Sequence, residues 1–238
     1  MCLNSAERGE RLAAIAASLL SALFGVVVFT RFLATRRPAF AAWTAGLAVF
    51  AAAAGCQAVG EHSGFSTPIF RAFYLLGGVL GVIWLSMGTL FLLAPLRVAA
   101  RACAILAIVT VVLAVDAAVV PVDASRLGTA TGVLGGAIAH GSLLQLGAVI
   151  LNILGTLILV GGSAWSAYRL IRDHGGVDRV VCNVLLTVGA FVIAGGFSAA
   201  KLAGGSLDTL GLYEAVGIGV MFAGFLSIGR LRRPAPAS

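Results

Sequence analysis

Long apolar runs separated by short polar segments dominate the chain. Seven of these runs contain roughly 20 residues or more, the length that a helix needs to cross a bilayer. They cover residues 12–33, 39–60, 69–94, 100–120, 143–168, 180–200 and 210–228. This pattern predicts an all-α, polytopic membrane protein, with residues 1–238 forming a single seven-helix transmembrane domain.

The composition agrees with this interpretation. Hydrophobic residues make up 60% of the 238 positions and charged residues only 11%, whereas a soluble domain carries about 25% charged residues. Little chain remains for a soluble catalytic, nucleotide-binding or DNA-binding domain. The net charge of +7 comes from Arg residues at the ends of apolar runs. We therefore expect a multi-pass protein of the cell membrane that contacts lipid and no nucleic acid.

The distribution of basic residues predicts the orientation, because the cytoplasmic loops of membrane proteins carry an excess of Lys and Arg. With the N-terminus outside, eleven basic residues face the cytoplasm and five face outward. The cytoplasmic set is Arg31, Arg36, Arg37, Arg97, Arg101, Arg169, Arg172, Arg179, Arg230, Arg232 and Arg233, and the outer set is Arg8, Arg11, Arg71, Arg126 and Lys201. We predict an external N-terminus and a cytoplasmic C-terminus.

The segment Thr129–Gly141 is weakly apolar and rich in Gly. Counting it as an eighth span would place the basic cluster around Arg169 outside. We therefore predict a loop helix that lies on the outer leaflet or dips into it.

The order of spans one to three is echoed in spans five to seven, with span four as a connector. In this comparison Tyr74, near the start of span three, corresponds to Tyr213, near the start of span seven. The pattern indicates a 3+1+3 parallel repeat. The layout is similar to that of the small sugar transporters called SWEETs, although the sequence has none of that family's motifs.

Ionisable groups at membrane depth are costly and are functional candidates by default. The stretch Gln57–Tyr74 concentrates such groups between spans two and three, and further acidic residues lie inside spans four and seven. With His62 and His140, these groups are predicted to line one outward-facing vestibule. The predicted ligand-binding residues are Glu61, Arg71, Tyr74, Asp116, Tyr213 and Glu214.

Structural alternatives exist for some of these residues. Glu61 and Arg71 are close enough to helix ends to form an ion pair that closes a short outer loop. Asp116 and Glu214 are flanked by apolar residues on both sides, which favours a functional role. A thin polar stripe in span five is typical of a face that contacts neighbouring helices. It contains Gln145, Asn152, Thr156 and Ser163.

The remaining chemistry is sparse. The four Cys residues are far apart and the three His residues lack metal-motif spacing, so we predict no metal site, no cofactor and no enzymatic activity. We expect small-molecule recognition or transport through the outward-facing pocket. The alternative is a structural or accessory subunit of a larger membrane complex. The oligomeric state remains open.

Overall fold

The computed structural model describes residues 5–129, 132–173, 176–202 and 207–230. Arg232 and Arg233, used above to predict the orientation, lie outside the described residues. The side chains of Arg8, Arg11, Lys201 and Arg230 are likewise outside the described part of the structure.

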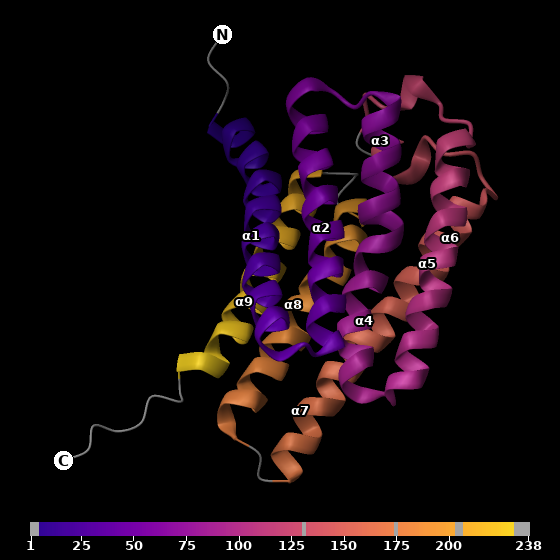
Figure 1. The fold of residues 1–238 in the computed structure, drawn as a ribbon. Helices are drawn as coiled ribbons and strands as arrows, with labels where there is room; N and C mark the ends of the chain where they lie inside the picture. Colours follow the sequence, from indigo (N-terminus) through magenta and orange to yellow (C-terminus); the bar gives the residue numbers. More distant parts are fainter. Residues whose placement is uncertain (1–4, 130–131, 174–175, 203–206, 231–238) are drawn as a thin grey trace.

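Within the described residues, seven helices are long and apolar enough to cross a membrane, which confirms the predicted number. Two of the spans are compound, because a short π-helical segment interrupts each of them (Figure 1). The elements are α1 (Ser5–Thr35), α2 (Pro38–Ser63), α3 (Thr67–Phe73), η1 (Tyr74–Leu80), α4 (Gly81–Leu93), α5 (Leu96–Val119), η2 (Ala124–Arg126), η3 (Gly132–Gly136), α6 (Leu143–Thr156), η4 (Leu157–Gly161), α7 (Gly162–Arg172), α8 (Val177–Leu202) and α9 (Leu207–Arg230).

Elementary constraints explain where these helices begin and end. A backbone in lipid must satisfy its own hydrogen bonds, which favours continuous helices over the apolar runs. Pro38 and Pro68 stand in the first turns of α2 and α3, where the missing N–H costs nothing. Pro95 directly precedes α5, and Pro121 follows its end.

Six of the spans form a ring, and the seventh lies outside it. α2 packs between α1 and α4, α9 packs between α1 and α8, and the α6–α7 span joins α4 to α8. α5 packs against α4 and α6 from the outside (Figure 1). Its other faces expose large apolar side chains, as expected of a helix surrounded by lipid. The repeat and the orientation in the membrane stay predictions.

The described part of residues 121–141, which we call the cap segment, contains the short helical segment η3 within the range of the predicted loop helix. The segment folds back on itself, with the Asp123 N–H donating to the Ala137 carbonyl at 2.9 Å. The chain is kinked within η3, where Gly135 has a φ of +112°. Val133 and Leu134 are buried against the aromatic side chains of α3 and η1. The described part of the cap segment is therefore a compact cover that packs on the bundle.

Candidate functional site

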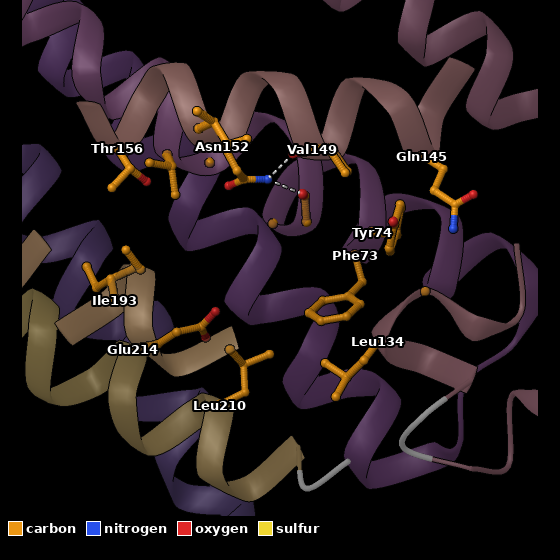
Figure 2. A pocket seen from close by; sticks show the side chains of 18 of the residues that line it. Phe73, Tyr74, Leu134, Gln145, Val149, Asn152, Thr156, Ile193, Leu210 and Glu214 are labelled. Atoms are coloured by element: carbon orange, nitrogen blue, oxygen red, sulfur yellow. Dashed lines mark hydrogen bonds between the residues drawn. The ribbon is translucent and has the colours of Figure 1, made fainter. Parts of the chain in front are cut away.

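A cavity of about 700 Å³ lies between the α6 side of the bundle, the η1–α4 region, the α8–α9 pair and the cap segment (Figure 2). This volume is in the range of small-molecule sites, which are mostly apolar with a few placed polar groups. Among the described lining residues, six side chains carry polar atoms and the others are apolar or glycine. These six are Tyr74, His140, Gln145, Asn152, Thr156 and Glu214.

Backbone geometry opens space for the cavity along span three. Gly77, Gly78 and Gly81 line it without side chains, and the first two belong to the π-helical segment η1. A π-helical turn inside an α-helix changes the backbone pairing and is frequent at functional sites. Asn152 of α6 donates hydrogen bonds from Nδ2 to the Gly78 and Ala148 carbonyls, each at 2.7 Å (Figure 2). The Asn152 amide thereby ties α6 to η1 across the cavity wall.

Tyr74 and the cap segment close one end of the cavity. The Tyr74 side chain is only 5% exposed, and its ring packs on Phe70 with the centroids 5.9 Å apart. A Cβ at Gly135 would lie 3.1 Å from the Tyr74 hydroxyl oxygen. Leu134 lies beside Phe73 in the wall (Figure 2). Close contact between η1 and the cap segment therefore depends on Gly135.

Glu214 is the acidic side chain of the wall. It comes from α9, is only 9% exposed, and points into the space between α9 and α6 (Figure 2). Its Oε2 atom is buried and has no hydrogen-bond partner among the described residues. Ile193 and Leu210, which lie beside it in the wall, offer only apolar side chains. Glu214 is one of the predicted ligand-binding residues, and its role in binding stays a prediction.

Glu61 lies behind this wall, at the end of α2. Its Oε1 accepts a 2.7 Å hydrogen bond from Nε2 of Gln57, which also donates to the Leu207 carbonyl of α9 at 3.2 Å. Gln57 is fully buried. The Gln57–Glu61 pair thus joins α2 to the start of α9.

Arg71 and Asp116 are absent from the described cavity wall, because both side chains bind backbone groups elsewhere. The Arg71 guanidinium donates to the carbonyls of Ala118 and Val120 at the end of α5, a common way to satisfy the last carbonyls of a helix. Asp116 accepts a hydrogen bond from the Leu144 N–H at the start of α6. Glu61 and Arg71, whose side chains are both described, do not form the ion pair with each other that was the predicted structural alternative.

Of the other residues predicted to line the vestibule, one lies in the cavity wall and two lie elsewhere in the bundle. Tyr213 packs against Gly196 of α8, where a Cβ would lie 2.6 Å from the Tyr213 Cβ. It and His62 are missing from the described lining residues, whereas His140 lies in the cavity wall and is exposed.

The residues of the polar stripe in span five have two different surroundings. Gln145, Asn152 and Thr156 line the cavity, whereas a stripe of this kind is typical of a face that contacts neighbouring helices. Ser163 fits that prediction, because it accepts a 2.9 Å hydrogen bond from the Thr187 hydroxyl of α8. The helical spacing of these residues in the sequence already placed them on one face of the span. The sequence alone did not show that α6 and α8 diverge beside them.

Over the described ranges, no group of three or more His, Cys, Asp or Glu side chains is arranged to hold a metal ion. Comparison of the chain with protein-family models, with curated proteins and with solved structures gives no match.

Proposed function

We propose that this membrane protein recognises or transports a small molecule that binds in the cavity between α6 and α9. The observation that carries the proposal is the cavity itself, which has the size of a small-molecule site and places a buried carboxylate in an apolar wall. Polar groups from several spans converge on this space, as they do in binding sites built between helices of a bundle.

The shape of the cavity supports access for a solute. Val149 and Ile153 line the cavity, and each side chain is more than half exposed. The α6 side of the cavity wall therefore includes side chains that also reach the surface of the bundle. Because α6 belongs to a membrane-spanning helix, a ligand with an apolar body would reach the cavity from the bilayer or through the exposed end at His140.

The proposal is tested by filling the cavity. Ala148 lies in its wall, whereas Ala164 of the same span is exposed and absent from the described wall. The purified wild type, Ala148→Phe and Ala164→Phe are screened against a panel of neutral and charged small molecules by thermal unfolding. A ligand at a free concentration of 100 times its Kd stabilises a protein by about 2.7 kcal/mol.

We expect some compounds to raise the Tm of the wild type and of Ala164→Phe but not of Ala148→Phe. If no compound distinguishes the two variants, the cavity is not a binding site and the proposal fails.

A further inference from the structure

The ionic character of the cavity wall indicates the class of ligand. A buried carboxylate is costly unless it is paired or hydrogen-bonded. Glu214 is more than nine-tenths buried, and its Oε2 has no partner within the described part of the chain. Because Glu214 is one of the residues that line the cavity (Figure 2), a ligand bound there would lie beside its carboxyl group.

No Lys or Arg is found among the described residues that line the cavity. Arg71 belongs to span three, and its guanidinium already donates to the carbonyls of Ala118 and Val120. Glu214 is the one acidic side chain among the described residues that line the cavity. Electrostatic complementarity therefore favours a cationic ligand and disfavours an anionic one.

The rest of the wall favours an organic cation over a metal ion. A hard cation such as Ca²⁺ takes six to eight oxygen ligands, whereas Ile193 and Leu210 beside Glu214 present only carbon atoms. Phe73 and Tyr74 add aromatic rings to the same cavity. Aromatic rings attract organic cations through their π faces, and α6 contributes the apolar side chains of Ala148, Val149 and Ile153 beside its polar ones.

We propose that the cavity binds a lipophilic organic cation, whose charged centre pairs with Glu214 and whose apolar body lies along α6. This inference rests on the proposed small-molecule function and adds the chemical class of the ligand.

The experiment uses tetraphenylphosphonium as a cationic probe with a permanent charge, and triphenylphosphine oxide as a neutral compound with similar aromatic groups. Binding to the full-length protein in detergent is measured by equilibrium dialysis. The variants are Glu214→Gln and, as a matched loss of one carboxylate, Asp178→Asn. Asp178 lies in the first turn of α8, outside the described cavity wall.

We expect saturable binding of tetraphenylphosphonium to the wild type and to Asp178→Asn, with similar Kd values. Removing one partner of a buried charge pair is costly, so Glu214→Gln should weaken this binding by about 30-fold or more. Triphenylphosphine oxide should bind the wild type more weakly, and its affinity should not fall in Glu214→Gln.

Absence of saturable tetraphenylphosphonium binding to the wild type would overturn the inference. So would equal affinity of the wild type for both probes, or full affinity for the cation in folded Glu214→Gln. The comparison of the two probes on the wild type needs no variant, so a folding defect in Glu214→Gln leaves the test decisive. If neutral compounds bind in a manner that Ala148→Phe abolishes, the proposed function stands while the cationic class fails.

Discussion

The carboxylate of Asp116, in α5, accepts a 2.9 Å hydrogen bond from the backbone N–H of Leu144, in the first turn of α6. The first N–H groups of a helix have no partner within the helix. Ser142 accepts from the Gln145 N–H at 3.3 Å, and Gln145 Oε1 accepts from the Gly141 N–H at 3.1 Å. Asp116 thus completes the capping of α6, and its negative charge is favourable at this helix end.

Replacing Asp116 should affect stability rather than ligand binding. Loss of a side-chain oxygen that caps a helix N-terminus costs about 1 kcal/mol, so Asp116→Ala should lower the free energy of unfolding by this amount. Asp116→Asn keeps an oxygen acceptor and should have a smaller effect. Denaturant unfolding in micelles provides the measurement. If both variants lose ligand binding without losing stability, Asp116 belongs to the binding site instead.

Gly135 should resist substitution because of its backbone conformation and its contact with Tyr74. Its φ of +112° is unfavourable for other residues, and a Cβ there would lie 3.0 Å from Tyr74 Cε2. We expect Gly135→Ala to lower the free energy of unfolding by about 2 kcal/mol.

Gly128→Ala is the matched control for Gly135→Ala, because Gly128 belongs to the same cap segment and a Cβ there would meet no atom within 4 Å. Thermal unfolding of the two variants measures the difference. Equal Tm values would show that the Gly135–Tyr74 contact contributes nothing to stability.

The α8–α9 interface should depend on one glycine of α9 and not on its neighbour. A Cβ at Gly217 would lie 2.5 Å from Ile193 Cγ1 and 2.8 Å from the Gly189 carbonyl oxygen, whereas a Cβ at Gly219 would meet nothing within 4 Å. Gly217→Ala should destabilise the protein by about 1–3 kcal/mol through overpacking. Gly219→Ala should be close to neutral in the same unfolding assay, and an equal loss in both would contradict close packing as the cause.

The pKa of Asp123, in the cap segment, should depend on the hydrogen bond that this carboxylate accepts from Ser125. The Ser125 hydroxyl donates a 2.6 Å hydrogen bond to Asp123 Oδ1, and this bond is the main cause that lowers the pKa of Asp123 below its ordinary value. Such a carboxylate stabilises the fold above its unfolded-state pKa, and the contribution is lost as the pH falls through the folded-state pKa. Ser125→Ala should raise the pKa of Asp123, measured by carboxyl NMR, and an unchanged value would rule out the hydroxyl as the cause.

The roles of the intramembrane acidic residues show where sequence reasoning reached its limit. Asp116 and Glu214 are both flanked by apolar residues, so the sequence suggested the same role for each. The structure separates them, because the partner of Asp116 is an N–H 28 residues away on another helix, while Glu214 lies in the wall of the cavity (Figure 2). Arg71 is a similar case, since its partners at Ala118 and Val120 are 47 and 49 residues away.

The sequence by itself determined the seven helices and most of their ends. A run of apolar residues in lipid has to satisfy its backbone within one helix, and residues such as Pro38 and Pro95 mark the boundaries locally. The tertiary structure alone decided which polar groups share a cavity, because this depends on which helix faces meet and where they diverge. The stripe containing Asn152 was visible in the sequence, but only the separation of α6 from α8 and α9 places it opposite Glu214.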